Sequence, residues 1–182
     1  MKNKYLLLIT TSHKPSPRTR SFVKDLANTL PSSLRVTRGK KTLVEIGLEA
    51  YRFKTRYVFI VNEKRGNPSS IRVYGADYLG KMPRLKHTHT IILGGVKLTR
   101  ENPESTRAYN PETININYDR CETDKCYKLA DLLASIYHEI LSDKPDIEIE
   151  LIEKNYVFFK PLNRLGKICG PILKIKDVKT IV

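Results

Sequence analysis

The sequence predicts an α/β fold in which short, buried strands alternate with amphipathic helices. Two observations lead to this prediction: apolar runs of strand length bounded by polar residues, and helix-start signals that follow these runs. Over the first 75 residues the order is strand, helix, strand, helix, strand, strand, which is typical of an α/β sheet. Strands joined through helices pair in parallel with right-handed crossovers, so we expect the first three strands to be parallel.

The first part of the chain carries the clearest element signals. Residues 5–10 form an apolar run that ends in polar residues, as a buried parallel strand does. Ser16 and Pro17 are typical of an N-cap and a first helical residue, and Pro31 ends this helix. Thr42 and Glu45 have the spacing of a capping box and open a second helix. Further strands are expected at residues 34–37, 56–62 and 71–74.

The second part of the chain repeats the order strand, helix, strand, strand only weakly. A strand at residues 88–93 ends at two glycines, and a helix with an apolar stripe begins after Thr123. Residues 96–121 form a long polar stretch with a short strand at 114–118, which indicates a functional or mobile segment. The last strands are expected at 147–151, 156–160 and 172–175. Because no linker-like composition separates the parts, we expect one domain spanning residues 1–182.

Positive charge is concentrated in the first third of the chain. Residues 1–66 hold 15 of the 33 Lys and Arg residues but only 4 of the 19 Asp and Glu residues, and the whole chain has a net charge of +14. The carboxyl ends of parallel strands share one edge of the sheet, so the basic loops 11–16, 38–41 and 63–66 should converge there. Two helices also begin at this edge, and helix N-termini attract phosphate. We expect exposed cations without a neutralising carboxylate, and hence a polyanionic partner.

The sequence gives little support for catalysis or for a bound cofactor. It contains no phosphate-binding loop, nucleophile elbow or dinucleotide-binding motif, so no cofactor is expected. His87 and His89 share one face at the start of a strand, but no third metal ligand can be named. His13 lies in the first basic loop, as a phosphate contact or as a general base. The acidic residues between 119 and 124 are better explained by helix capping than by a metal site.

Cysteine usage and hydropathy indicate an intracellular, soluble protein. Cys121, Cys126 and Cys169 form no Cys-x-x-Cys pair, and no histidine lies near them at zinc-ligand spacing. We therefore expect neither a disulfide framework nor a zinc site. The apolar run at residues 5–9 is too short for a signal-peptide core or a membrane span. The expected location is the cytoplasm, with no membrane partner.

Four stretches of the sequence carry a resemblance to a known family. They are TSHKPSPRTRSFVKDLANTLP at residues 11–31, RGKKTLVEI at 38–46, EKRGNPSSIRVYG at 63–75 and CGPILKIKDV at 169–178. Together they resemble the Brix-domain family of ribosome-biogenesis proteins, in its short archaeal form, over essentially the whole chain. The resemblance implies an α/β fold of two similar halves, at about 1–80 and 86–180. Each half would be a mixed sheet with packed helices, similar to the anticodon-binding domain of some aminoacyl-tRNA synthetases.

The resemblance also implies binding of ribosomal RNA during subunit assembly, without catalysis. By motif match, the family's binding residues fall on Lys14, Arg18, Arg20, Arg38, Gly39, Lys40, Lys64, Arg65 and Gly66, and the charge pattern adds Lys24 and Lys41. The prediction is a non-enzymatic factor for pre-rRNA processing and subunit assembly, which binds ribosomal RNA or its precursor and has ribosome-assembly proteins as further partners. Phosphate contacts would supply its affinity. The alternatives are a tRNA-binding module and a metal-dependent RNA nuclease that uses His13 or the His87/His89 pair.

Overall fold

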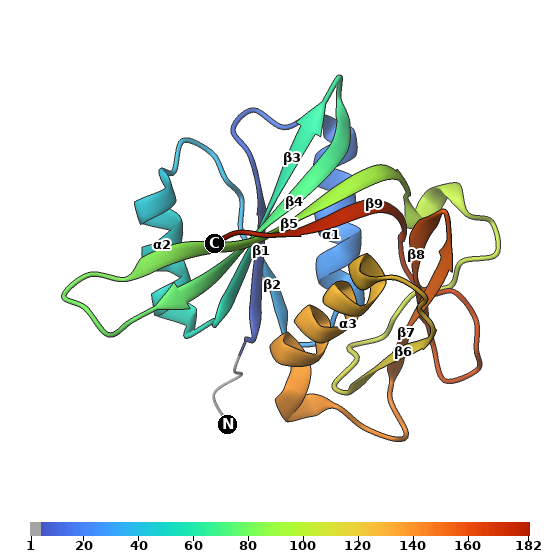
Figure 1. The fold of residues 1–182 in the computed structure, drawn as a ribbon. Coiled ribbons are helices and arrows are strands. Elements are labelled where there is room, and N and C mark those ends of the chain that lie inside the picture. Colours follow the sequence, from blue (N-terminus) through green and yellow to red (C-terminus); the bar gives the residue numbers. More distant parts are fainter. Residues whose placement is uncertain (1–4) are drawn as a thin grey trace.

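A nine-stranded sheet runs through the computed structural model, which describes residues 5–182. The order along the sheet is β2-β1-β3-β4-β5-β9-β8-β7-β6 (Figure 1). The strands are β1 (Leu7–Thr11), β2 (Ser33–Arg35), β3 (Tyr57–Lys64), β4 (Asn67–Asp77), β5 (Arg84–Lys97), β6 (Ile114–Arg120), β7 (Ile147–Lys154), β8 (Tyr156–Leu162) and β9 (Ile172–Thr180). The helices are α1 (Pro17–Thr29), α2 (Leu43–Phe53) and α3 (Asp124–Tyr137), with short 3-10 turns η1 (Thr99–Glu101) and η2 (His138–Ile140). None of the helices in the described part of the chain has the length and apolar character needed to cross a membrane.

The first three strands pair in parallel, as predicted. β1 lies between β2 and β3, with Leu8 opposite Leu34 on one side and opposite Val58 on the other. β4 and β5 then add to β3 in antiparallel order. In the second part of the chain β6 and β7 are parallel, and β8 and β9 follow in antiparallel order. Because β5 also pairs with β9, strands from both parts of the chain form one sheet.

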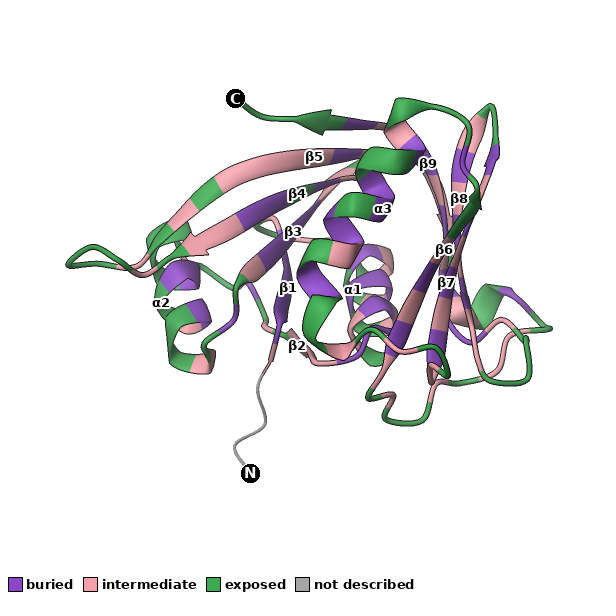
Figure 2. Cartoon of the chain, turned by 60° about the horizontal axis from the view of Figure 1, so that its bottom comes forward, coloured by how far each residue is buried: buried purple, intermediate pink, exposed green. Residues whose placement is uncertain are grey.

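Helices pack on both faces of the sheet because successive strand residues point to opposite sides. Leu7 and Ile9 of β1 belong to the main core, where Phe22 of α1 and apolar residues of α3 are also buried. Leu8 points to the other face and packs with Ile46 of α2. Figure 2 shows buried residues along the strands and on the inward sides of the helices. α1 and α3 therefore share one face of the sheet, and α2 covers part of the other.

The predicted end of the strand at Gly94 and Gly95 is wrong. β5 continues to Lys97, and its pairing with β9 shifts register between Ile92 and Leu93 and again between Leu93 and Gly95. Bulges of this kind absorb glycine without ending a strand. The continued strand leads the chain to Thr99 and Arg100, which form hydrogen bonds with Asp25 and Ser21 of α1.

A disulfide joins Cys121 to Cys126, which corrects the expectation that the cysteines would remain unpaired. The turn between β6 and α3 brings their Cα atoms to 5.4 Å, within the range for a disulfide. The sequence spacing alone did not reveal this turn. Cys169 stays a free, buried thiol, and burial raises its pKa to about 11, so it is protonated at neutral pH.

The loop between β8 and β9 closes tightly on the end of α1 at Gly170. A Cβ atom at Gly170 would lie 2.4 Å from Oγ1 and 2.6 Å from Cγ2 of Thr29. Thr29 is buried, and its hydroxyl donates to the Asp25 carbonyl oxygen at 2.8 Å, so it has little freedom to move away. This close approach explains why the CGP stretch needs glycine at its centre.

We expect Gly170→Ala to lower the free energy of unfolding by about 2 kcal/mol, because the added methyl group overpacks the contact with Thr29. Gly80→Ala is the matched control, since a Cβ atom at Gly80 has its nearest neighbour at 3.8 Å. Urea denaturation of both variants measures the difference. Equal stability of the two variants would show that the loop moves aside without cost.

Candidate nucleic-acid interface

Three loops lie together beyond β1, β2 and β3, as the parallel strand order predicts. A ring nitrogen of His13 donates to the Lys41 carbonyl oxygen at 2.9 Å, which joins the first loop to the second. The Ser16 hydroxyl donates to the Gly66 carbonyl oxygen at 2.8 Å, which joins the first loop to the third. We call residues 11–16, 38–41 and 63–66 the basic edge.

A carboxylate sits within the basic edge, contrary to the expectation that none would. Glu63, near the end of β3, accepts hydrogen bonds from the Ser16 backbone N–H at 2.9 Å and from the Thr19 hydroxyl at 2.5 Å. These bonds, from Thr19 first and Ser16 second, lower the pKa of Glu63 despite some opposing burial. Glu63 is therefore ionised at neutral pH, and it fixes the start of α1 to the β3–β4 hairpin.

Protein side chains cap both helices that begin at the basic edge. The Ser16 side chain accepts from the Thr19 N–H at 3.2 Å at the start of α1. At α2, the Thr42 side chain accepts from the Glu45 N–H, and the Glu45 carboxylate accepts from the Thr42 N–H, which is the predicted capping box. Because the carboxylates of Glu63 and Glu45 lie at these two helix starts, a phosphate near this edge would bind to cationic side chains rather than to the helix ends.

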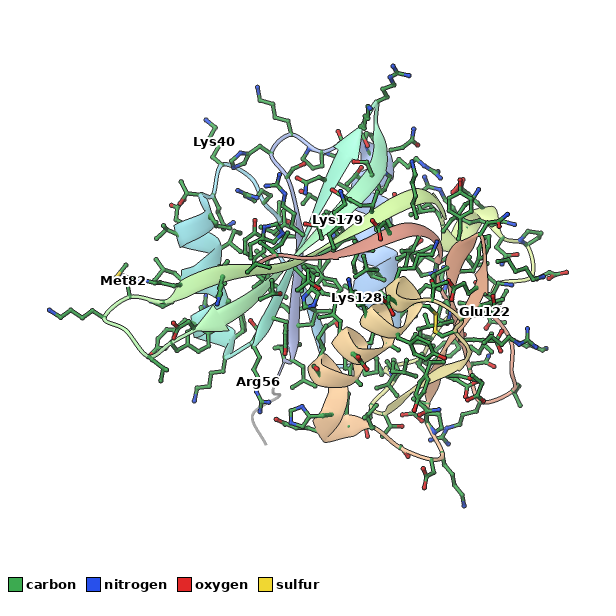
Figure 3. All side chains as sticks on the ribbon, in the orientation of Figure 1. Lys40, Arg56, Met82, Glu122, Lys128 and Lys179 are labelled. Atoms are coloured by element: carbon green, nitrogen blue, oxygen red, sulfur yellow. A yellow bond between two sulfur atoms is a disulfide. The ribbon has the colours of Figure 1, made fainter. Side chains whose placement is uncertain are left out.

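Most of the predicted RNA-binding side chains are exposed. Those in the exposed class are Lys14, Arg20, Lys24, Lys40, Lys64 and Arg65, together with Gly39. Figure 3 shows Lys40 extending away from the ribbon at this edge. Gly39 has a φ of 52° and takes the left-handed conformation that the turn requires. Lys41 is half-buried, and its ammonium group donates to the Thr37 carbonyl oxygen at 3.0 Å.

Two of the arginines predicted to bind RNA form hydrogen bonds within the protein instead of extending into solvent. Arg38 is only 9% exposed, and its guanidinium group donates to the carbonyl oxygens of Lys41, at 2.7 Å, and Thr11, at 3.1 Å. Burial lowers the pKa of Arg38 from its ordinary value. Arg18 donates twice to the Glu101 carboxylate, at 2.8 and 2.9 Å. We therefore assign both arginines a positioning role within the interface.

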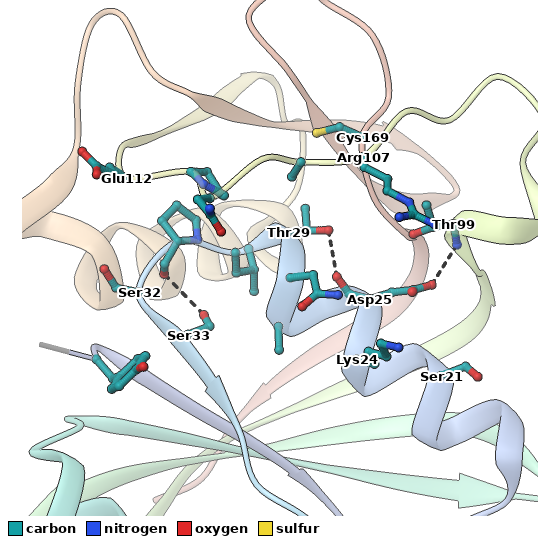
Figure 4. A pocket seen from close by; sticks show the side chains of 18 of the residues that line it. Ser21, Lys24, Asp25, Thr29, Ser32, Ser33, Thr99, Arg107, Glu112 and Cys169 are labelled. Carbon is teal, nitrogen blue, oxygen red and sulfur yellow. Dashed lines mark hydrogen bonds between the residues drawn. The ribbon is translucent and has the colours of Figure 1, made fainter. Parts of the chain in front are cut away.

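The stretch at 96–121 brings two further arginines beside α1. The Thr99 N–H donates to the Asp25 carboxylate at 2.9 Å, and Arg100 donates to the Ser21 hydroxyl at 2.9 Å. These contacts form one wall of a cleft of about 950 Å³, which also has Lys24 and Arg107 in its lining (Figure 4). Sequence reasoning missed both arginines, because only the path of the polar stretch places them. Their presence in a predicted functional stretch was the one available signal.

In the second parallel strand pair, as in the first, a glutamate near the end of a strand accepts hydrogen bonds at the start of a helix. Glu153 of β7 accepts hydrogen bonds from the backbone N–H groups of Glu122, at 2.6 Å, and Thr123, at 2.9 Å, and from the Thr123 hydroxyl. Burial opposes ionisation of Glu153, but these hydrogen bonds outweigh it and lower its pKa. Thr123 is the N-cap of α3, as predicted, although the capping oxygens come from Glu153.

The histidine pair is engaged within the sheet. His87 lies 2.9 Å from the Thr90 hydroxyl and stacks on the ring of Tyr74 with 5.1 Å between centroids. Burial, and then the neighbouring charges of His87 and Lys128, lower the pKa of His89. Within residues 5–182, no three His, Cys, Asp or Glu side chains gather where they could hold a metal ion.

Comparison with known proteins identifies clear relatives, although no family model matches the chain. A probable Brix domain-containing ribosomal biogenesis protein of Aeropyrum pernix is 43% identical over 93 residues, which cover 51% of this chain and 50% of that protein. A protein of the same description from Pyrococcus horikoshii is 45% identical over 101 residues, covering 53% and 41%. The chain thus matches about half of these curated relatives' length.

Solved structures resemble the chain over nearly its full length. The crystal structure of a probable ribosomal biogenesis protein from Aeropyrum pernix K1 superimposes with a TM-score of 0.80 and 30% identity, covering 94% of this chain and 95% of that one. An archaeal Imp4-like protein superimposes with a TM-score of 0.66 and 22% identity, covering 96% and 99%. The second likeness bears on the fold alone.

We expect Glu63→Gln to lower the free energy of unfolding at pH 7 by about 1.5 kcal/mol, because it removes a charge-assisted cap. The folded pKa lies below the ordinary 4.5, so this stability is present above pH 4.5 and is lost as the pH falls through the folded value. The gap between wild type and variant should therefore shrink in acid. Denaturation across pH, with the exposed Glu104→Gln as control, measures it. A gap that is constant with pH would contradict the ionised cap.

Proposed function

This chain belongs to the family of Brix domain-containing ribosomal biogenesis proteins, and from that premise we propose that it is a non-enzymatic factor that binds ribosomal RNA or its precursor during subunit assembly. The observation that carries the proposal is the basic edge, where Lys14, Lys40 and Arg65 are exposed on three joined loops. Loops held in place by internal hydrogen bonds present their charges without a large ordering cost on binding.

We further propose that the RNA path extends from the basic edge along α1. Arg20 and Lys24 are one helical turn apart on the exposed side of α1, and Lys24 also lines the cleft with Arg100 and Arg107. The 13 residues of α1 span about 20 Å, enough for several successive phosphates. Such contacts position RNA without reading its sequence, which would require unstacked bases or RNA shape.

The matching caps support a fold of two similar halves, at about 1–80 and 86–180, within one domain. Glu63 and Glu153 each occupy the next-to-last position of an eight-residue strand, and each caps a helix that lies earlier in its own half. In both cases a lysine follows and then a residue with positive φ, Arg65 or Asn155. We infer that the halves derive from one unit, of the kind expected for an anticodon-binding domain.

The setting proposed for this function is the archaeal cytoplasm. The curated relatives come from archaea such as Aeropyrum pernix and Pyrococcus horikoshii, and their descriptions name ribosome biogenesis. Pre-rRNA processing would then depend on RNA folding and on ribosome-assembly proteins that act together with this chain, rather than on chemistry at its surface.

We expect the triple variant Arg20→Ala, Lys24→Ala, Lys40→Ala to bind pre-ribosomal RNA fragments more weakly and with a flatter salt dependence. Removing one phosphate contact should reduce the slope of log K against log salt by about 0.7, so three substitutions should change the slope by about two units. Filter binding across a salt series measures it.

The control removes equal charge elsewhere, with Lys144, Lys154 and Lys176 replaced by alanine, because all three are exposed in the second part of the chain. An equal change of slope in both variants would show that RNA binding depends on the net charge of the chain and not on a particular interface. Transfer RNA that competes as well as pre-ribosomal fragments would support the tRNA-binding alternative. RNA cut during incubation with Mg²⁺ would support the nuclease.

A further inference from the structure

Within residues 5–182, strand β6 has a neighbouring strand on one side only, because it ends the nine-stranded sheet (Figure 1). The Ile147 N–H of β7 donates to the Thr113 carbonyl oxygen at 3.2 Å, so this carbonyl group faces β7. The backbone groups of successive residues alternate in direction along a strand, so those of Ile114, Ile116 and Tyr118 point away from β7. We call the backbone groups of these three residues the free edge of β6.

Turns of the chain close both ends of the free edge, but its middle is open. The Ile114 carbonyl oxygen accepts from the Ser142 N–H at 3.0 Å. The Tyr118 carbonyl oxygen accepts from the Cys121 N–H, also at 3.0 Å. The N–H and the carbonyl oxygen of Ile116 have no hydrogen-bond partner in the described part of the chain. Unpaired backbone groups on an edge strand are a template for pairing with another segment.

In the first part of the chain, a strand fills the place that is open beside β6. β1 pairs in parallel with β3 as β6 does with β7, and Glu63 and Glu153 hold the same position in β3 and β7. Counted back from these glutamates, Ile9 of β1 corresponds to Ile116. The Ile9 carbonyl oxygen accepts from the Val36 N–H at 3.0 Å, just after β2. Beside β6 the described chain forms a single bridge and then turns toward β7, so it supplies no counterpart of β2.

The face of the sheet beside the free edge is acidic. In the first part of the chain, α2 covers this face and packs on an apolar row formed by Leu8, Val58 and Ile60. The same registers in β6 and β7 carry Asn115, Glu148 and Glu150, which are half-buried. Lys160 stands opposite Glu150 on β8 but forms no ion pair with it among the described residues. Two carboxylates therefore lie beside the free edge in a chain whose net charge is +14.

An extended segment placed beside β6 would meet different chemistry on its two sides. On the acidic face, Glu148 and Glu150 would stand two strands away, about 10 Å, a span that a lysine or arginine side chain and a glutamate side chain bridge together. On the other face, its side chains would adjoin Ile116. Leu141 and Tyr118, at the two ends of the free edge, are 43% and 53% exposed. The free edge therefore suits a segment in which basic residues alternate with apolar ones.

The same carboxylates disfavour two other occupants. Glu148 and Glu150 would repel a phosphate backbone, and RNA offers no row of N–H and carbonyl groups to pair with a strand. A second copy of this chain, paired edge to edge, would bring the carboxylates of both copies together.

We propose that the free edge of β6 binds an extended segment of a partner protein in which apolar residues alternate with lysine or arginine. The segment would pair with Ile116 as the chain after β2 pairs with Ile9, and it would add a strand to the sheet. β2 has only 3 residues, so a short segment suffices. The proposal uses no residue assigned to RNA binding, so its test is independent of the proposed function.

Amide hydrogen exchange followed by NMR tests the free edge in the unbound chain. The Ile116 amide should exchange about tenfold faster than the Asn115 amide, because the Asn115 N–H points to β7 and the Ile116 N–H meets water. An Ile116 amide as protected as that of Asn115 would overturn the proposal, because the edge would then be closed.

Binding is tested with a peptide of about seven residues in which lysine and valine alternate, titrated into the full chain. The peptide should slow exchange at Ile116, whereas the same peptide with glutamate for lysine, or with methylated backbone nitrogens, should not. Tyr118→Pro removes an N–H from the free edge, and proline is tolerated on edge strands. It should weaken peptide binding about tenfold relative to Tyr118→Ala, which also loses the exposed ring but keeps that N–H.

The acidic face is tested by Glu148→Gln with Glu150→Gln, which should weaken binding of the lysine peptide about tenfold. The control is Glu49→Gln with Asp77→Asn, which removes two carboxylates from the first part of the chain and should leave binding unchanged. Equal binding of the glutamate peptide or of the methylated peptide would overturn the proposal, as would no binding at all.

The Tyr118→Pro variant also distinguishes the other occupants. A dimer in sedimentation velocity that this variant dissociates would make a second copy the occupant, and weaker RNA binding by the variant would assign the edge to RNA. Either result would overturn the proposal. We expect the variant to lose the peptide while its affinity for RNA stays unchanged, which separates this proposal from the proposed function.

Discussion

The carboxylate of Glu63 is the contact on which the basic edge depends. The edge gathers cations from three loops, and their mutual repulsion would spread those loops apart without an opposing charge. Glu63 supplies that charge and also accepts from Ser16 and Thr19, so the start of α1 is tied to the β3–β4 hairpin. Hydrogen bonds to a charged group contribute about 1.5–3 kcal/mol each, more than an exposed ion pair does. A single half-buried carboxylate can thus offset the repulsion and leave the outer cations free.

Arg38 complements Glu63 from the other side of the first loop. Its guanidinium group donates to the carbonyl oxygens of Thr11 and Lys41, which joins the first and second loops. One half-buried anion and one buried cation therefore hold the three loops, while lysines with no such role extend outward. This division explains why a phosphate would be bound by side chains here, although two helices begin nearby.

Local sequence signals predicted the helix starts, which depend on residues close together in the sequence. Pro17 and the Thr42–Glu45 pair fixed two helix starts, because capping depends on residues three or four apart. The parallel order of β1, β2 and β3 followed from connection rules. The pairing of β5 with β9, which completes the sheet, and the disulfide between Cys121 and Cys126 depend on tertiary placement, and no short-range pattern records it.

The roles of the arginines in the candidate interface also depend on tertiary placement, which local sequence patterns do not show. Arg18 and Arg20 are equivalent in a charge pattern, yet one is paired with Glu101, 83 residues away, and the other is exposed. Only the fold distinguishes the arginine that positions a segment from the arginine that meets solvent. In the same way, Arg100 lines the cleft because the neighbouring Thr99 N–H donates a hydrogen bond to the Asp25 carboxylate, which lies 74 residues earlier in the chain.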